Sequence, residues 1–228
     1  MRIRRTGIPR CASAILGALA AATLLGTAAP AYGACGGVER FLPEDSPSSE
    51  RPPLAVGDSI MLGAVDQLSR RGFEVDVRGC RQFSEGLSVI AARARTGTLP
   101  GVVVMALGTN WTVERRQVRR ALITLGRNRV LGLVTPREVG GVASSDQSVM
   151  RAAGRRWRRR VRVLDWVRYS SGHWNWFWSD GLHLQPRGAR ALTRLVAPAL
   201  SWGPPDYDAP PPVDPALSAG SARAAASG

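Results

Sequence analysis

Residues 101–110 read Gly-Val-Val-Val-Met-Ala-Leu-Gly-Thr-Asn, and this stretch decides the fold. Its six successive apolar residues, 102–107, are bounded by Gly101 and Gly108. A half-exposed strand alternates apolar and polar side chains, whereas an uninterrupted apolar run is typical of a strand buried on both faces. The stretch therefore predicts a central strand in a sheet that helices cover on both sides.

Strands and helices alternate along the chain on either side of this strand. The other strands are predicted at residues 53–58, 73–77, 130–135 and 161–166. Helices are predicted at residues 60–70, 84–95, 113–125, 145–160 and 188–200, the second with Ser84 as an N-cap but without a capping box. Strands separated by helices pair in parallel through right-handed crossovers. The expected fold class is α/β: a three-layer α/β/α sandwich with a five-stranded parallel sheet.

The two ends of the chain differ from its middle. Residues 1–33 read as a secretory signal, with four arginines, an Ala/Leu-rich run and small residues before Ala34. An uncleaved anchor is the alternative, because the apolar run approaches the ~20 residues that span a bilayer. A lipid anchor on Cys35 is disfavoured, because Tyr32 lies where bacterial lipoprotein signals usually carry leucine or a similar aliphatic residue. Residues 34–53 are predicted to be a Pro/Ser-rich linker, 54–202 a single domain, and 203–228 a disordered Pro/Ala-rich tail.

The chain is strongly basic. Its formal charge is +14, and all 31 basic residues are arginine. Such a charge favours polyanions outside the cell, including wall polymers and lipid headgroups, while nucleic acid is not expected for an exported protein. The run at residues 155–160, with Trp157 interleaved, could contact a polyanion, but a solvated basic face at a helix end is the favoured interpretation. We expect a monomer without stable membrane insertion after signal cleavage.

Two cysteines remain once Cys11 leaves with the signal. Cys35 and Cys80 form an even pair in a compartment where disulfides persist, so a bridge between them is predicted. The alternative is two unrelated thiols, one on a mobile arm and one half buried.

Candidate site residues follow the predicted strands at their carboxyl ends, which is where a parallel sheet forms its ligand site. They are Ser59 after the first strand, Gly79 and Cys80 after the second, Asn110 after the third, and Asp180 and His183 before the last helix. We therefore expect these loops to form one site.

Ser59, His183 and Asp180 have the residue types of a nucleophile, a base and an orienting acid. Ser59 alone could simply cap a helix, and His183 could be a structural loop histidine. Asp180 lies three residues before His183, so it can hold the imidazole ring while the other ring nitrogen faces the serine. The other histidine of the chain, His173, lies among aromatic residues and is the competing candidate for the base.

Three donors are predicted for an oxyanion hole: the N–H of Ser59, the side-chain amide of Asn110 and an N–H from the loop at Gly79. An Asn turn that satisfies only its own loop is the alternative for Asn110. Trp111 and Trp178 flank the site and are predicted to bind substrate, with core packing as the alternative.

These loops resemble the SGNH hydrolase superfamily over roughly residues 54–200. The first, third and last of its blocks are similar to residues 57–59 (Gly-Asp-Ser), 108–110 (Gly-Thr-Asn) and 180–183 (Asp-Gly-Leu-His). Residues 81–82, 135–137 and 165–166 are similar to the extracytoplasmic domains of peptidoglycan O-acetyltransferases. Those domains often carry Gly where this chain has Cys80, so either Gly79 or Cys80 could supply the second-loop donor. The resemblance implies a flavodoxin-like fold.

The predicted function is that of an exported serine esterase, wall-associated or secreted, which hydrolyses small acyl esters, acetyl above all, on a carbohydrate or cell-wall polymer. No metal or organic cofactor is required. O-acyl transfer to a wall glycan is one alternative, and it would need an acyl donor supplied by another protein or a soluble ester. A non-catalytic module that binds glycans or polyanions is the other.

Overall fold

The computed structural model describes residues 35–43, 51–137 and 144–207, all of which belong to one compact unit, residues 32–228. The predicted signal at 1–33 and residues 208–228 of the predicted tail lie outside these ranges. None of the helices within the ranges has the length and apolar character needed to span a bilayer.

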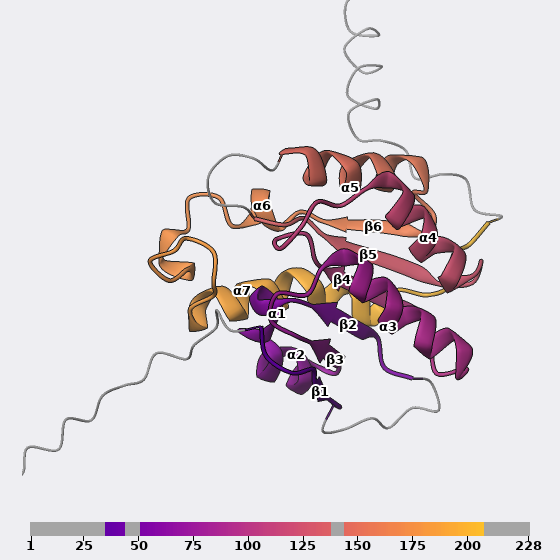
Figure 1. Ribbon diagram of the computed structural model, residues 1–228, viewed down its shortest axis with the longest axis horizontal. Coiled ribbons are helices and arrows are strands. Elements are labelled where there is room, and N and C mark those ends of the chain that lie inside the picture. The colour runs from indigo at the N-terminus through magenta and orange to yellow at the C-terminus, as the bar shows by residue number, and fades with distance from the viewer. Residues whose placement is uncertain (1–34, 44–50, 138–143, 208–228) are drawn as a thin grey trace, which may run out of the picture. The chain divides into compact units, whose positions relative to one another are not determined.

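The sheet has six strands in the order β1-β3-β2-β4-β5-β6 (Figure 1). Five of them pair in parallel, as predicted, and β1 is an additional antiparallel strand at the edge beside β3. The apolar run quoted above forms β4, which is fully buried between β2 and β5. The strands are β1 (Glu39–Phe41), β2 (Leu54–Gly57), β3 (Glu74–Val77), β4 (Val102–Ala106), β5 (Val130–Val134) and β6 (Val161–Leu164).

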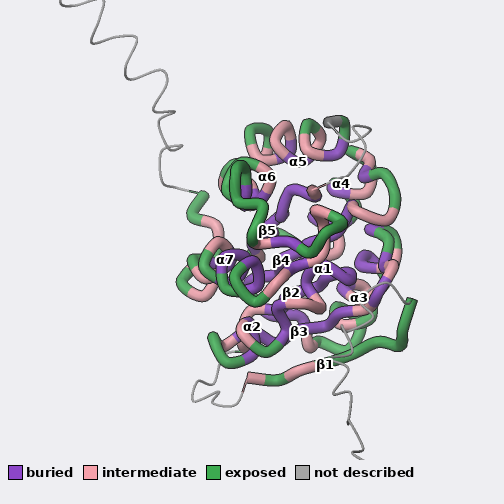
Figure 2. Tube along the Cα trace, turned by 90° about the vertical axis from the view of Figure 1, so that its left-hand side faces the viewer, coloured by how far each residue is buried: buried purple, intermediate pink, exposed green. Residues whose placement is uncertain are grey.

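Helices cover both faces of the sheet and so confirm the three-layer arrangement (Figure 2). One face packs against α3 (Phe83–Arg95), α4 (Arg115–Leu125) and α5 (Ser144–Arg156). The other packs against α1 (Ser59–Leu62), α2 (Val65–Arg71), α7 (Pro186–Val196) and the 3-10 helix η2 (Ala197–Ser201). Two short elements lie between β6 and α7, namely α6 (Trp166–Tyr169) and η1 (Trp174–Trp176).

Most helix boundaries lie within a few residues of the predictions, and three differences change how a helix begins or ends. The helix expected at residues 60–70 is divided into α1 and α2, because the chain turns at Gly63, which lies against Leu184. The N-cap of α3 is Gln82 rather than Ser84, and it forms a capping box in which Glu85 accepts from the N–H of Gln82 at 2.8 Å. The helix expected at 145–160 ends at Arg156, and residues 157–160 form turns.

The edge strand β1 lies within the segment that was predicted to be a linker. Its three residues are too few to show a periodic pattern, so the sequence does not reveal it. It is held through contacts with distant residues: Arg40 donates to the buried carboxylate of Asp76 at 2.8 Å, and Cys35 is bonded to Cys80. The five-stranded prediction was therefore short by one strand.

Part of the predicted tail packs on the domain. The hydroxyl of Tyr207 donates to the carbonyl of Arg127 at 2.8 Å, and the carbonyl of Tyr207 accepts from Arg159 at 2.7 Å. Residues 203–207 are thus held by contacts with distant residues, which composition does not indicate.

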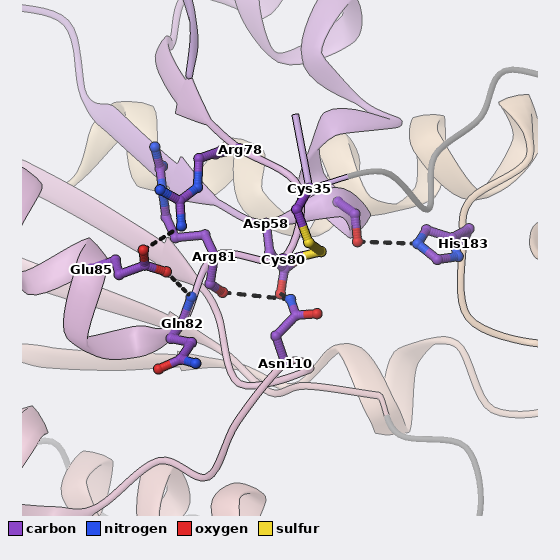
Figure 3. The surroundings of a disulfide bond; sticks show 10 residues. Cys35, Asp58, Arg78, Cys80, Arg81, Gln82, Glu85, Asn110 and His183 are labelled. Carbon is purple, nitrogen blue, oxygen red and sulfur yellow. Dashed lines mark hydrogen bonds and ion pairs between the residues drawn. A yellow bond between two sulfur atoms is a disulfide. The ribbon is translucent and has the colours of Figure 1, made fainter. Parts of the chain in front are cut away.

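The predicted disulfide between Cys35 and Cys80 is present (Figure 3). Cys80 has a φ of 55°, in the left-handed region that normally favours glycine. The bond therefore joins the segment before β1 to an unusual turn directly after β3.

We expect replacement of both cysteines by serine to lower the free energy of unfolding by about 2–4 kcal/mol, because the bond closes a long loop. Cys35→Ser/Cys80→Gly also lacks the bond, but it should be about 1 kcal/mol more stable than the double serine variant because glycine adopts the left-handed turn freely. Urea unfolding measures both differences. Equal midpoints for the wild type and both variants would contradict this account.

Candidate active site

Ser59, His183 and Asp180 form a hydrogen-bonded series at the carboxyl ends of the strands. The Oγ of Ser59 lies 3.1 Å from Nε2 of His183, and Nδ1 of His183 lies 2.7 Å from Oδ2 of Asp180. Because the Asp180 carboxylate accepts a hydrogen bond from Nδ1–H of His183, the neutral ring leaves Nε2 free to accept a hydrogen bond from the serine hydroxyl. Ser59 is the first residue of α1, so its own N–H has no acceptor within that helix.

Asp180 is fixed by its own loop. Its Oδ1 accepts from the N–H groups of Leu182 at 2.8 Å and His183 at 3.0 Å. Burial by itself would raise the pKa of Asp180, but the hydrogen bonds from His183 and Leu182 outweigh it and hold that pKa below its ordinary value. The carboxylate is therefore charged at neutral pH and can stabilise a protonated His183.

Arg137 supports this loop from the end of β5. Its Nε donates to the carbonyl of Gly181 at 2.8 Å, and its guanidinium lies 4.4 Å from the ring centre of Phe177. Burial lowers the pKa of Arg137. Gly181 has a φ of 68°, so the turn between Asp180 and His183 needs glycine. The planar guanidinium can satisfy both contacts at once, which a lysine cannot.

Asp58, next to the serine, is a buried carboxylate that ties two loops together. Its Oδ1 accepts from the N–H of Ile60 at 3.0 Å, and its Oδ2 accepts from the amide of Asn110 at 3.2 Å. Burial raises the pKa of Asp58 to about 6, against the lowering effects of the Ile60 N–H, of nearby His183 and of Thr109. The sequence places Asp58 between Gly57 and Ser59 in the first motif but does not indicate this role.

Asn110 reaches the site but its amide is engaged. Besides the bond to Asp58, it donates to the carbonyl of Arg81 at 3.5 Å, the limit of hydrogen-bond length (Figure 3). The weak second contact is the one that an oxyanion could replace. To act as a donor to the oxyanion, the Asn110 amide must therefore give up its hydrogen bond to the Arg81 carbonyl and donate to the substrate oxygen instead.

Gly79 and Cys80, the other predicted donors, lie in the turn after β3. Within the described part of the chain, neither N–H donates to another group of the protein, so both are available. The buried Arg81 holds this turn, since it donates to the carbonyls of Gly57 at 3.2 Å and Asp76 at 2.6 Å and to the Asp76 carboxylate at 2.7 Å.

The aromatic residues around the site divide into two groups. Trp111 and Trp178 are 67% and 38% exposed, so neither is part of the core, and the N–H of Trp178 donates to the carbonyl of His183 at 2.8 Å. His173 instead stacks on Trp176 with ring centres 3.9 Å apart. The structure therefore places His183, and not the competing His173, beside Ser59.

No metal site accompanies these residues. Within residues 35–43, 51–137 and 144–207, no group of three or more His, Cys, Asp or Glu side chains is placed to hold a metal ion.

Comparison with known proteins finds sequence relatives among O-acetyltransferases, while no family model matches the chain. The chain is 27% identical to O-acetyltransferase OatA of Staphylococcus aureus (strain NCTC 8325 / PS 47) over 153 residues, 65% of this chain and 25% of the relative. It is 28% identical to the putative peptidoglycan O-acetyltransferase YrhL of Bacillus subtilis (strain 168) over 150 residues, 64% of this chain and 23% of the relative. The chain thus spans about a quarter of the length of these relatives.

Solved structures share the fold. The C-terminal catalytic domain of Streptococcus pneumoniae peptidoglycan O-acetyltransferase A, with a methylsulfonyl adduct, superposes with a TM-score of 0.58 at 20% identity, covering 66% of this chain and 93% of that one. The chain therefore shares the fold of this catalytic domain. A Clostridium thermocellum family 3 carbohydrate esterase shares the fold as well, with a TM-score of 0.50, 14% identity and coverage of 65% and 94%.

The pH dependence of the stability of this domain should report on Asp58. The native pKa of about 6 lies above the ordinary value of 3.8, so the native state binds the extra proton. Stability from this group is therefore present at low pH and is lost as the pH rises from about 4 to about 6. Relative to Asp58→Asn, the wild type should lose about 2–3 kcal/mol of unfolding free energy over this range. Asp66→Asn, at an exposed carboxylate, is the control, and a pH-independent difference for Asp58→Asn would contradict the prediction.

Loss of the Arg137 guanidinium should misplace the base while leaving the domain folded. We expect Arg137→Lys to slow labelling of Ser59 by a fluorophosphonate about tenfold or more, because a small displacement of the base greatly weakens activation. Arg168→Ala, which removes an exposed arginine in α6, should label at the wild-type rate. Unchanged labelling of Arg137→Lys would show that the loop keeps its geometry without the guanidinium.

Proposed function

We propose that this chain is an exported serine esterase that hydrolyses small acyl esters, acetyl above all, on a carbohydrate or cell-wall polymer. The observation that carries the proposal is the hydrogen-bonded series from Ser59 through His183 to Asp180. A binding module has no use for this arrangement, whereas acyl transfer requires it.

In the proposed reaction the Oγ of Ser59 attacks the acyl carbonyl carbon as His183 takes the hydroxyl proton at Nε2. Asp180 stabilises the charged ring. The N–H of Ser59, an N–H of the Gly79–Cys80 turn and the amide of Asn110 are the proposed donors to the oxyanion. His183 then returns the proton to the leaving sugar oxygen, which leaves an acyl ester on Ser59. Water attacks this ester as one of its protons passes to His183, which then gives that proton to the Ser59 oxygen as the carboxylic acid leaves.

Hydrolysis is favoured over transfer by the openness of the site. The side chain of Asp180 is 47% exposed and that of His183 19%, so solvent reaches the loop that carries the base. Transfer to a sugar hydroxyl is the second candidate, because the sequence relatives are named as O-acetyltransferases. The same acyl-enzyme serves both reactions, and the acceptor that reaches it decides between them.

Export is part of the proposal. The signal-like residues 1–33 support it, and so does the disulfide between Cys35 and Cys80, since such bonds persist outside the reducing cytosol. The substrate class rests on the relatives, one of which is named a peptidoglycan O-acetyltransferase in Listeria monocytogenes.

We expect Ser59→Ala and His183→Ala each to reduce turnover of a chromogenic acetate ester by about 10³-fold or more. His173→Ala is the matched control at the other histidine and should retain near wild-type turnover, because it removes a packing contact away from Ser59. Loss of activity in His173→Ala with retention in His183→Ala would reverse the assignment of the base. Absence of turnover and of fluorophosphonate labelling in the wild type would support a binding module instead.

A further inference from the structure

A basic groove lies between α4 and α5, on the sheet face that α3, α4 and α5 cover. Its volume is about 950 Å³. Arginines from both helices and from the turns that follow them line it: Arg115, Arg116, Arg119, Arg127, Arg156 and Arg160. The arginine-rich run at residues 155–160 therefore faces, in part, a second set of arginines from α4.

The positive charge of the basic groove is largely uncompensated. Within the described ranges, Arg116 is the one groove arginine that forms an ion pair, with Glu114. Arg115, Arg119, Arg127 and Arg156 are exposed. A solvated basic face would spread these charges apart, whereas here they converge on a concave surface, and this concentrates an attractive potential for anions.

Part of the lining of the basic groove is apolar, and the two sides of the groove are joined by hydrogen bonds. Leu122, Ile123 and Trp157 contribute to the lining, and Ile123 is 69% exposed. Nη2 of Arg160 donates to the carbonyl of Leu122 at 2.8 Å and also to that of Gly126, so the chain after α5 is joined to the end of α4. Nε of Arg160 is buried without a hydrogen-bond partner among the described residues. The groove is thus preformed.

Much of the basic groove lies near the amino ends of the strands, whereas the triad lies at their carboxyl ends. Arg127 precedes β5, and Arg156 and Arg160 precede β6, which places them near the amino ends of these strands. Ser59 follows β2 at a carboxyl end. None of the residues that line the groove belongs to the triad or to its proposed oxyanion donors, so a ligand bound there would leave the triad accessible.

We infer that the basic groove binds a linear anionic polymer in which phosphodiester groups alternate with uncharged polyol units. Arginine matches phosphate because its planar fork donates two parallel hydrogen bonds. The apolar part of the lining suits the carbon atoms between phosphates, and α4 alone offers about 16 Å of length, enough for several charges. A flat membrane surface would meet only the rims of a groove. A single aromatic residue, Trp157, provides little stacking for nucleic acid bases.

The inference is tested by measuring binding of poly(glycerol phosphate) by calorimetry. Arg119→Ala/Arg127→Ala/Arg156→Ala should weaken binding about tenfold or more and reduce the slope of log K against log salt by about 2, since three phosphate contacts are lost. Arg70→Ala/Arg71→Ala/Arg194→Ala removes the same charge from exposed positions of α2 and α7 on the other face, and should weaken binding less than threefold. Replacement of the three groove arginines by lysine keeps the charge and should recover most of the affinity.

Each other outcome overturns the inference. Equal losses in the two alanine variants would indicate diffuse attraction by net charge. Tighter binding of phosphatidylglycerol vesicles or single-stranded DNA than of the polymer, lost in the groove variant, would assign the groove to a membrane or a nucleic acid. Ester turnover of the groove variant should equal that of the wild type, and because binding is measured directly, the result is independent of the proposed reaction.

Discussion

The site depends on the buried ion pair between Arg81 and Asp76. The guanidinium contacts the Asp76 carboxylate and also the carbonyl of Gly57, two residues before Ser59. The carbonyl of Arg81 accepts from Asn110. One side chain and its backbone thus join the loops after β2, β3 and β4. Removing Asp76 would leave the buried charge of Arg81 without its ion-pair partner, and such a loss typically costs 3–5 kcal/mol.

The same ion pair explains why the N-terminal segment joins the sheet. Arg81 occupies one oxygen of the Asp76 carboxylate, and Arg40 of β1 occupies the other. The disulfide from Cys35 then fixes this segment to Cys80, directly before Arg81 in the chain. The edge strand, the left-handed turn and the proposed oxyanion donors are therefore parts of one arrangement, organised around a carboxylate in the middle of a strand.

The base, His183, is positioned by interactions other than the Arg81–Asp76 ion pair. His183 lies in a loop that no strand or long helix includes, and its position is set by Asp180, by the glycine turn and by Arg137 from the neighbouring strand end. Arg137, which lies outside the loop, therefore helps to hold it in place. The basic groove lies mainly near the amino ends of the strands, so attachment to an anionic polymer and ester chemistry can proceed on different surfaces of one small domain.

The sequence by itself determined the layered fold and the triad. The apolar run at 102–107 is buried on both sides only when helices cover both faces of the sheet. The topology of a parallel sheet then brings Ser59, Asn110 and His183 to the carboxyl ends of the strands. Tertiary structure decided what depends on contacts between distant residues: the strand β1, the supporting roles of Asp58 and Arg137, and the engaged state of the Asn110 amide. Periodicity and motifs report which side chains face a core or a loop, but a hydrogen bond between loops depends on distances that arise only when the chain has folded.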